Sequence, residues 1–583
     1  MAAEDLEARV AEWERLDWLG GGGGGGGGDG HGGAPAAAAE LEDAFCGRLA
    51  FGTAGLRGLT GPGFNRMNHV TVVQTTQGLC RYLERTCPEQ LAAGGVAIGF
   101  DGRHRSDEFA RLAASVCVAR GVPVHLFARM VPTPLLATCV AEKGAAAGIM
   151  VTASHNPKEY NGYKVYWGNG CQIVPPHDAG IAACIEEELP IGPLPDPAGS
   201  PLVADPEAEV GAAYLRAVAD RVCFFPGRFR AAAPVVYTPL HGVGLRWVEA
   251  AFEACGLPAP VPVAEQAAPD PEFPTVRFPN PEEGAGVWDL AIATAERAGA
   301  RLCVANDPDA DRLALCERQP DGAWRSFTGN EIGALLGDWI LRHGVPEGER
   351  ARTCFLASTV SSKMLGAVAE AEGFRFEETL TGFKWLGNRA LELAAEGCAV
   401  PFAFEEAIGF MFGHLNDKDG VAGACAAAEM AAALAAEGSS LAGRLAELHA
   451  AYGCFVGRQG YFLADAPAKT AAVFARIRAE GYPETIGGLR VVGVRDLGTG
   501  LDTGKPGGRT DLHWAPGDLM VTYTLEGGGT LTIRVSGTEP KLKYYLEVSA
   551  ADEAAAAEKA DRLLAAVESE VVRPREHDLQ GGV

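Results

Sequence analysis

At 583 residues, the chain is too long for a single compact core, and its length predicts roughly three to five domains. Hydrophobic residues make up 47% of it, so large cores can form, whereas a net charge of -25 argues against a surface that binds the phosphate backbone of a nucleic acid. The fifteen cysteines include no C-x-x-C pair, and the first residues are acidic, unlike a signal peptide. We therefore expect a soluble, cytoplasmic, monomeric protein with small-molecule ligands and no nucleic-acid or membrane partner.

A glycine tract dominates the N-terminal 40 residues. Residues 20–28 are all glycine, and further glycines follow up to Gly33. Because glycine offers no side chain to a core, residues 1–40 are predicted to be a flexible segment, with a short helix at 7–18. The folded body is expected to begin near Leu41.

From there, a pattern of strand, helix, strand and polar loop occurs three times. The first copy has strands at 96–100, 122–127 and 148–151 around a helix at 107–120. The second has strands at 235–237 and 301–305 and a helix at 245–254, and the third has strands at 354–357 and 400–404 and a helix at 361–372. The alanine-rich stretch 424–436 is predicted to be a core helix because Glu429 interrupts it.

This alternation predicts an α/β fold with three βαβ-type mixed-sheet domains. After residue 456 the order changes to strands at 491–495, 520–525 and 531–535 and a helix at 553–568, which predicts a C-terminal α+β domain that closes one central cleft. The expected domains are 41–220, 221–335, 336–455 and 456–583. Ligands of such folds gather beyond the carboxyl ends of the strands, where all three polar loops lie.

The first polar loop contains Ser154, within the sequence Thr-Ala-Ser-His-Asn-Pro. Ser154 is the candidate for covalent catalysis, but an unassisted serine hydroxyl is a poor nucleophile, so a metal, a base and phosphate ligands must lie elsewhere in the chain. The alternative role for Ser154 is an ordinary helix cap or serine turn.

The second polar loop carries three carboxylates at alternate positions, Asp307, Asp309 and Asp311. Pro308 disfavours helical geometry at Asp307, and in an extended loop alternate side chains share one face, so three oxygen ligands can converge on Mg²⁺. A solvated acidic turn is the alternative. A calcium-binding EF-hand is excluded, because Arg312 and Arg318 stand where its glycine and glutamate are needed.

Other stretches have the composition of phosphate or sugar sites, although each is also compatible with an ordinary turn or core segment. A glycine-rich loop at 52–58 contains Arg57, and a loop at 534–541 combines Arg534 with hydroxyls and a glycine. The stretches 381–385 and 404–409 offer carboxylates and aromatic rings to a sugar.

Taken together and in this order, these motifs resemble the α-D-phosphohexomutase superfamily from about Leu41 to the C-terminus. The stretches 52–58, 161–167 and 537–541 resemble its phosphoglucomutase 2 branch, which contains phosphopentomutases and a synthase of glucose 1,6-bisphosphate. Two details favour the phosphopentomutases of this branch: Pro157 completes the sequence Ser-His-Asn-Pro, and Ala407 stands where many members carry a serine that contacts the sugar.

The resemblance implies that Ser154 carries a phosphate and binds Mg²⁺ together with the three aspartates. It implies that Lys164 and Lys418 act as general acid and base, in an order left open, and that Glu405 contacts sugar hydroxyls. The remaining residues that it places at the reaction centre or on the substrate are Arg57, His155, Arg312, Thr381, Gly382, Lys384, Arg534, Ser536, Gly537, Thr538 and Lys541.

The activity implied by the resemblance is interconversion of ribose 1-phosphate, deoxyribose 1-phosphate or glucose 1-phosphate with the 5- or 6-phosphate. Glucose 1,6-bisphosphate or ribose 1,5-bisphosphate would prime the serine. Two alternatives remain: synthesis of glucose 1,6-bisphosphate from 1,3-bisphosphoglycerate, and a non-catalytic sensor of sugar phosphates.

Overall fold

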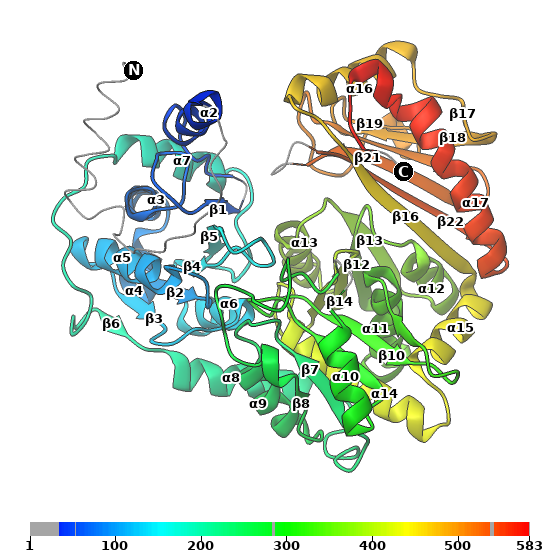
Figure 1. Ribbon diagram of the computed structural model, residues 1–583, viewed down its shortest axis with the longest axis horizontal. Coiled ribbons are helices and arrows are strands. Elements are labelled where there is room, and N and C mark those ends of the chain that lie inside the picture. The colour runs from blue at the N-terminus through cyan, green and yellow to red at the C-terminus, as the bar shows by residue number, and fades with distance from the viewer. Residues whose placement is uncertain (1–33, 53, 283–285, 537–540, 582–583) are drawn as a thin grey trace. The chain divides into compact units, whose positions relative to one another are not determined.

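The computed structural model describes residues 34–52, 54–282, 286–536 and 541–581. The predicted glycine linker and the helix before it lie outside these residues, as do Gly537 and Thr538. The chain divides into two compact units (Figure 1). The first comprises Met1–Gly344 and Phe383–Gly438, and the second comprises Val345–Gly382 and Ser439–Val583.

The first unit begins with a six-stranded sheet in the order β1-β5-β4-β2-β3-β6. Strands β2 and β4 are parallel neighbours made of buried residues, and both α5 and α6 pack against them, as is usual for central parallel strands. β5 runs antiparallel to β4 and β1. The elements are α2 Ala34–Phe45, β1 Gly55–Leu59, α3 His69–Thr86, α4 Pro88–Gly94, β2 Val96–Phe100, α5 Ser106–Ala119, β3 Val124–Leu126, α6 Thr133–Lys143, β4 Ala147–Val151, β5 Tyr160–Trp167, α7 His177–Glu187, β6 Val203–Ala204 and α8 Glu207–Arg221.

A second sheet of the same unit has five strands in the order β11-β10-β9-β7-β8. β7 pairs in parallel with β9 and β8, whereas β10 is antiparallel to β9. Helix α10 packs against β7 and β9 over a small apolar cluster. The elements are β7 Val235–Thr238, α9 Leu245–Cys255, β8 Val261–Pro262, α10 Asp289–Ala298, β9 Leu302–Ala305, β10 Ala314–Arg318, β11 Trp324–Ser326 and α11 Gly329–Gly344.

The last part of the first unit is α13 Phe383–Ala395, the hairpin of β14 Ala399–Glu405 and β15 Gly409–Phe412, and α14 Gly420–Ala436. α14 contains the alanine-rich stretch, and most of its residues are buried, as expected of a core helix. The Asp419 side chain caps it by accepting a hydrogen bond from the Ala422 amide.

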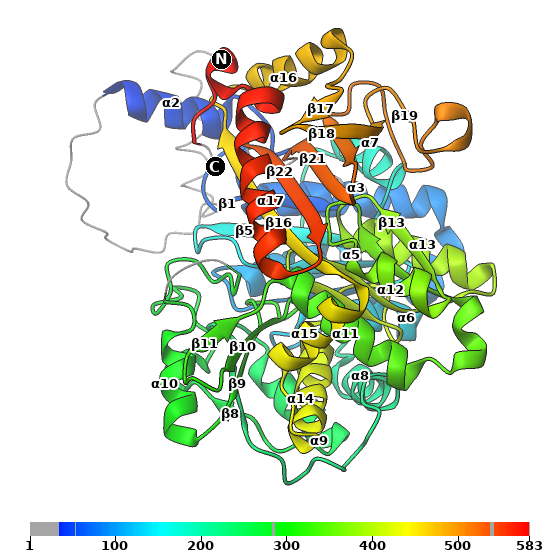
Figure 2. The ribbon, with the colours of Figure 1, turned by 90° about the vertical axis from the view of Figure 1, so that its right-hand side faces the viewer.

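The second unit contains the parallel pair β12–β13 and a seven-stranded antiparallel sheet in which β16-β22-β21-β20-β18-β17 are consecutive and β19 pairs with β18. Figure 2 shows α17 lying along this sheet, where it contacts β16 and β22 over a large apolar core. The elements are β12 Thr353–Ser358, α12 Met364–Glu372, β13 Arg375–Thr379, α15 Leu441–Tyr452, β16 Cys454–Leu463, α16 Pro467–Glu480, β17 Thr485–Ile486, β18 Leu489–Asp496, β19 Leu501–Asp502, β20 Met520–Leu525, β21 Gly529–Val535, β22 Lys541–Ala550 and α17 Glu553–Ala566.

All fifteen cysteines are free, and all but Cys46 and Cys87 are buried, as expected of cysteines that act as small apolar residues. Among the described helices, none is by itself long and apolar enough to cross a membrane, and only α14 and α15 taken together meet that test of length and composition.

Candidate active site

The loop that follows β4 holds Ser154 in an unusual conformation. Ser154 has a φ of 53°, and its amide donates a hydrogen bond to Thr152 Oγ1 at 2.9 Å. Positive φ is uncommon for residues other than glycine and often occurs at functional sites, where the surrounding contacts must hold it. Only 2% of Ser154 is exposed, so almost none of the residue contacts solvent.

Arg103 holds this loop in place through hydrogen bonds to its backbone. Its guanidinium donates to the carbonyl oxygens of Ser154 and Asn156 at 2.5 Å each, of Pro157 at 2.9 Å and of Tyr160 at 3.2 Å. The Asp101 carboxylate lies 3.4 Å from Arg103 Nε, and both side chains are buried. One buried cation therefore fixes the backbone at Ser154 and in the residues that follow it, as far as Tyr160.

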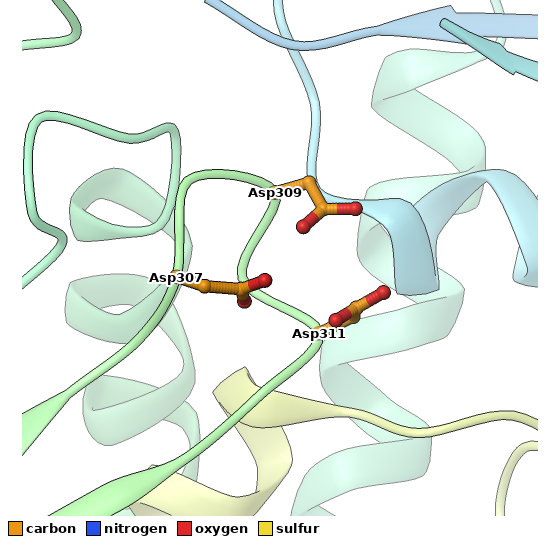
Figure 3. Close-up of side chains that lie close together, drawn as sticks. All are labelled: Asp307, Asp309 and Asp311. Atoms are coloured by element: carbon orange, nitrogen blue, oxygen red, sulfur yellow. The ribbon is translucent and has the colours of Figure 1, made fainter. Parts of the chain in front are cut away.

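The loop that follows β9 brings three carboxylates together (Figure 3). Asp307, Asp309 and Asp311 are each 0% exposed, and one carboxylate oxygen from each lies within 4.8 Å of the others. The predicted convergence is present, but the predicted extended loop is wrong. The Ala310 amide donates to the Asp307 carbonyl oxygen at 2.8 Å and Ala310 has a φ of 53°, so a tight turn rather than strand alternation collects the three side chains.

The serine and the acidic loop meet directly. Ser154 Oγ donates to Asp307 Oδ2 at 2.6 Å, and His155 Nδ1 lies 3.3 Å from the same hydroxyl. Burial, followed by the charges of Arg312 and Arg57, lowers the pKa of His155 well below its ordinary value, so the ring is neutral at physiological pH.

Two lysines share one oxygen of the acidic loop. The ammonium groups of Lys164 and Lys418 each lie 2.9 Å from Asp311 Oδ2, and Lys164 also donates to Asp309 Oδ2 at 2.6 Å. Lys164 comes from β5 and Lys418 from the residues just before α14. The structure therefore unites Ser154, the three aspartates and both predicted lysines within a single compact unit.

The ionisation of these groups follows from their burial and their neighbours. Burial, together with the charges of Asp309 and Asp311, raises the pKa of Asp307 well above its ordinary value. Burial has the same tendency at Asp309, but the Lys164 ammonium and hydrogen bonds outweigh it and lower the pKa of that carboxyl group. Burial disfavours the charge of Lys418, yet Asp311 and Asp417 outweigh it and raise its pKa.

The triad fits a divalent cation. Asp309 Oδ1 and Asp311 Oδ1 are buried without a hydrogen-bond partner among the described residues, although a buried charged oxygen normally has one. Three converging carboxylates form a hard oxygen donor set of the kind that Mg²⁺ prefers. These two oxygens and the carboxylate of Asp307 are therefore the groups that would hold the ion.

The loop between β14 and β15 lies against the acidic loop. The Leu313 amide donates to the Ile408 carbonyl oxygen at 3.0 Å, and Arg312 pairs with Gly409 in an isolated bridge. Glu405 is at the end of β14, next to this contact. The predicted sugar loop is thus adjacent to the predicted metal loop.

The predicted arginines of the first unit also border the reaction centre. Arg57 Nη1 donates to Asn156 Oδ1 at 3.1 Å, beside the serine loop. The Arg312 amide donates to Asp307 Oδ1 at 3.0 Å, and its Nε lies 4.0 Å from Asp307 Oδ2. Both residues therefore contact the serine loop or the acidic loop.

Lys384 is close to the start of α13 and is 9% exposed. Its ammonium lies 5.0 Å from the Trp385 ring, and burial lowers its pKa to about 8. An ammonium held in such surroundings is a candidate ligand for an anionic group of the substrate.

The other predicted substrate residues that the structure describes belong to the second unit. Arg534 Nη2 donates to the Tyr545 hydroxyl at 3.2 Å, and Lys541 Nζ lies 4.3 Å from the Tyr461 ring. Ser536 follows β21, and Thr381 and Gly382 end the first segment of this unit. Their proposed substrate contacts therefore remain predictions.

Three residues of the site were missed by the sequence analysis: Asp101, Arg103 and Thr133. Thr133 Oγ1 donates to Asp309 Oδ2 at 2.6 Å. Asp101 and Arg103 follow β2, so the rule that sites lie beyond the carboxyl ends of parallel strands could have found them. Thr133 has no such signal, because its role depends on a contact with a residue 176 positions away.

Comparison with known proteins agrees with this geometry. Three family models match consecutive parts of the chain: phosphoglucomutase/phosphomannomutase alpha/beta/alpha domain I over residues 48–190, domain II over 212–322 and domain III over 328–452. The predicted fold class, three α/β domains followed by a C-terminal domain, is thereby confirmed.

Relatives named for two activities are similar over almost the whole chain. Human phosphopentomutase is 44% identical and human glucose 1,6-bisphosphate synthase is 42% identical, each over 93% of this chain and over 92% and 90% of the respective relative. The fold of parafusin, a phosphoglucomutase from Paramecium, superimposes with a TM-score of 0.65 at 16% identity and covers 92% of this chain and 96% of that structure. The chain therefore belongs to the phosphoglucomutase/phosphomannomutase family, within the α-D-phosphohexomutase superfamily.

Proposed function

We propose that this protein is a phosphosugar mutase that converts ribose 1-phosphate and deoxyribose 1-phosphate to their 5-phosphates and glucose 1-phosphate to glucose 6-phosphate. One observation carries the proposal: Ser154 Oγ lies 2.6 Å from a carboxylate of a buried acidic triad that also contacts two lysines. The 44% identity to human phosphopentomutase supports the pentose reaction.

The reaction begins with a phosphate on Ser154. The 5- or 6-hydroxyl oxygen of the sugar 1-phosphate attacks phosphorus, and its proton passes to a basic group of the site. The bond from phosphorus to Ser154 Oγ breaks, and Ser154 Oγ takes up a proton from an acidic group of the site. The products of this half-reaction are a bisphosphorylated sugar and a free serine. A free bisphosphorylated sugar, glucose 1,6-bisphosphate or ribose 1,5-bisphosphate, would supply the first phosphate.

The second half-reaction reverses the roles of the two sugar positions. The bisphosphorylated sugar first reorients in the site. Ser154 Oγ then attacks the phosphorus at position 1, and the proton of the serine hydroxyl passes to a base. The bond from phosphorus to O1 breaks, and O1 takes up a proton, so the serine phosphate is regenerated. The net reaction is isomerisation.

In both steps, the protein positions the reacting groups and transfers protons. Arg103 holds the backbone of the serine loop, so Ser154 Oγ stays in the same place for both transfers. Lys164 and Lys418 are the proton-transfer groups, because their ammonium groups lie on the acidic loop that contacts the serine. Mg²⁺, when bound by the three aspartates, would offset the charge of the serine phosphate and polarise its bond to phosphorus.

We assign the remaining substrate contacts by family resemblance. Glu405 binds sugar hydroxyls, and Arg57, His155, Arg312, Thr381, Gly382 and Lys384 line the centre. Arg534, Ser536, Gly537, Thr538 and Lys541 hold the phosphate that does not react. We further propose the four domains expected from the sequence, residues 41–220, 221–335, 336–455 and 456–583.

Replacement of the serine tests the proposal. Ser154→Ala should reduce kcat for ribose 1-phosphate at least about a thousandfold, because no acceptor for the phosphate remains. Ser115→Ala is the matched control, because the buried Ser115 hydroxyl donates only to the Arg111 carbonyl oxygen within its own helix. Undiminished turnover by Ser154→Ala would refute the mechanism.

Synthesis of glucose 1,6-bisphosphate is a second candidate function, favoured by the 42% identity to the human synthase. Rates for 1,3-bisphosphoglycerate with glucose 1-phosphate should be compared with those for isomerisation of ribose 1-phosphate, deoxyribose 1-phosphate and glucose 1-phosphate. We expect primed isomerisation of ribose 1-phosphate to be fastest. A faster reaction with 1,3-bisphosphoglycerate would assign the protein to the synthases, and binding of sugar phosphates without any turnover would favour the non-catalytic sensor.

A further inference from the structure

The turn that carries Lys418 is bounded by two buried carboxylates, Asp417 and Asp419. Lys418 Nζ lies 2.9 Å from Asp311 Oδ2 but 3.9 Å from Asp417 Oδ1. Two negative groups therefore attract the same ammonium, and the nearer one belongs to the acidic triad. The location of the ammonium depends on what holds Asp417 in its present orientation.

Tyr166 holds Asp417. Its hydroxyl donates to Asp417 Oδ2 at 2.6 Å, and Gln172 Nε2 donates to the same oxygen at 3.1 Å. Tyr166 is 0% exposed, so this hydrogen bond does not compete with water. The other oxygen, Oδ1, accepts a hydrogen bond from the Lys418 amide at 2.8 Å, which completes the fixation of the carboxylate.

Tyr166 belongs to the same strand as the other lysine. Lys164 and Tyr166 are two positions apart on β5 and therefore point to the same face, while Tyr163 and Val165 point to the opposite face and join the hydrophobic core. Lys164 reaches Asp311 Oδ2 directly, and Tyr166 acts on Lys418 through Asp417. Strand β5 thus supplies one of the two ammonium groups at Asp311 Oδ2 and also the hydroxyl that acts on the other.

We infer that Tyr166 is a positioning residue for Lys418: its hydroxyl restrains Asp417 and so keeps the Lys418 ammonium on Asp311. The inference rests on the proposed function, in which Lys418 transfers protons. Without the hydroxyl, Asp417 Oδ2 retains only the Gln172 donor, and the carboxylate is free to turn toward Lys418. The ammonium then shifts from Asp311 toward Asp417, away from the reacting oxygens.

Tyr214 provides a matched control. Its buried hydroxyl donates to both oxygens of Asp419 at 2.9 Å each, so it also restrains a carboxylate adjacent to Lys418. Asp419, however, also contacts His414 Nε2 at 2.9 Å and caps α14, and the described ion pairs of Lys418 include Asp311 and Asp417 but not Asp419. Removal of this hydroxyl should weaken the fold without displacing Lys418.

The experiment compares kcat and KM of Tyr166→Phe, Tyr214→Phe, Lys418→Met and the double variant Tyr166→Phe/Lys418→Met, using the sugar 1-phosphate that the wild-type protein converts fastest. Tyr166→Phe should lower kcat about tenfold with KM changed less than about twofold, because a displaced catalytic group slows the chemical step more than it weakens binding. Tyr214→Phe should retain the wild-type kcat. In the Lys418→Met background, Tyr166→Phe should cause no further loss, because a residue that acts only through Lys418 has nothing left to position.

Three results would overturn the inference: a wild-type kcat for Tyr166→Phe, an equal loss in Tyr214→Phe, or the same fold loss with and without Lys418. If Tyr166→Phe does not fold, Gln172→Ala can replace it, because this substitution removes the other donor to Asp417 Oδ2. Gln172→Ala should lower kcat less than about tenfold, and the loss should again depend on Lys418. An undiminished kcat, or a loss of kcat that does not depend on Lys418, would count against the inference. Lys418→Met alone tests the proposed function, because full activity of that variant removes the assigned role of Lys418 whatever Tyr166→Phe shows.

Discussion

Ser154 can be predicted from sequence as a nucleophile, but the contacts that hold it in place cannot. The motif around it predicts a nucleophile, but nothing in the motif indicates that the loop has a positive φ or that Arg103, 51 residues earlier, holds it. Local sequence thus predicts which residue does the chemistry. The contacts that fix its position come from distant segments and appear only in the folded chain.

Arg103→Lys should damage both stability and catalysis. A lysine ammonium lacks the planar fork of donors that reaches four carbonyl oxygens from one side chain, so most of these hydrogen bonds would be lost. We expect the free energy of unfolding to fall by about 3 kcal/mol and kcat to fall about a hundredfold. Denaturant unfolding and steady-state kinetics measure the two effects.

Arg111→Lys is the control for Arg103→Lys, because its exposed ion pair with Asp107 contributes little. If Arg103→Lys retained the wild-type kcat, the serine loop would not depend on this guanidinium.

Lys384 should impose a pH-dependent cost on the fold. Burial lowers its pKa from 10.5 to about 8, so the unfolded state binds more protons than the folded state between pH 8 and pH 10.5. Stability therefore rises with pH through that window, and at pH 7 the charged form costs about 2 kcal/mol. Lys384→Met should be more stable than the wild type at pH 7 and should lose that advantage by pH 10.5.

Denaturant unfolding of both proteins from pH 7 to pH 10.5 checks this difference. Equal stability of the two proteins at pH 7 would mean that Lys384 is not buried as described.

At the scale of elements, periodicity and composition predict the regular segments well. The strands expected at 96–100 and 520–525 coincide with β2 and β20, because their apolar runs are buried in the sheets. The helix expected from residue 361 begins only at Met364, because Ser361 bonds back to Ser358 Oγ at 2.8 Å and the Ser362 hydroxyl accepts from the Met364 amide. Local side-chain bonding of this kind leaves little periodic signal.

The conformation of the acidic loop is another feature that sequence alone does not predict. Alternate spacing correctly predicts that three carboxylates converge, but the turn that brings them together requires Ala310 in the left-handed region. Alanine does not favour that conformation, so sequence alone gives no reason to expect it. Contacts from α14 help to hold the loop, since the Gly420 amide donates to the Ala310 carbonyl oxygen at 3.1 Å.

Gly420→Ala should separate α14 from the acidic loop. A Cβ at this position would lie 2.2 Å from the Arg312 carbonyl oxygen and 2.8 Å from that of Ala310, so backbone must move. We expect a loss of about 2 kcal/mol in unfolding free energy and at least about tenfold in kcat, because both Lys418 and the triad would shift. Gly348→Ala, where nothing lies within 4 Å of the added Cβ, is the control. Equal effects of the two substitutions would contradict this close contact.

At the scale of the whole molecule, the two compact units have separate hydrophobic cores. One large core lies within residues 56–185 of the first unit, and another lies within residues 462–579 of the second. The acidic triad belongs entirely to the first unit. Ligand binding to the triad should therefore stabilise that unit directly.

Mg²⁺ should raise the thermal stability of the first unit. A ligand at one hundred times its Kd stabilises the state that binds it by about 2.7 kcal/mol. Hydrogen exchange can show which segments of the chain are stabilised. We expect added Mg²⁺ to slow exchange in β9 and the loop after it, with no change in β20 or β21 of the second unit. The variant Asp309→Asn/Asp311→Asn should lose this response. Protection that persisted in the variant would place the cation elsewhere.

In the proposed mechanism, Ser154 carries a phosphate that is exchanged with sugars. Protein labelled with isotopic phosphate from glucose 1,6-bisphosphate can be digested to locate the label, then mixed with unlabelled ribose 1-phosphate or glucose 1-phosphate in a single turnover. We expect the label to reside on the peptide containing Ser154 and to move to the sugar at a rate at least equal to kcat. A label on any other residue, or a serine phosphate that persists through many turnovers, would contradict this mechanism.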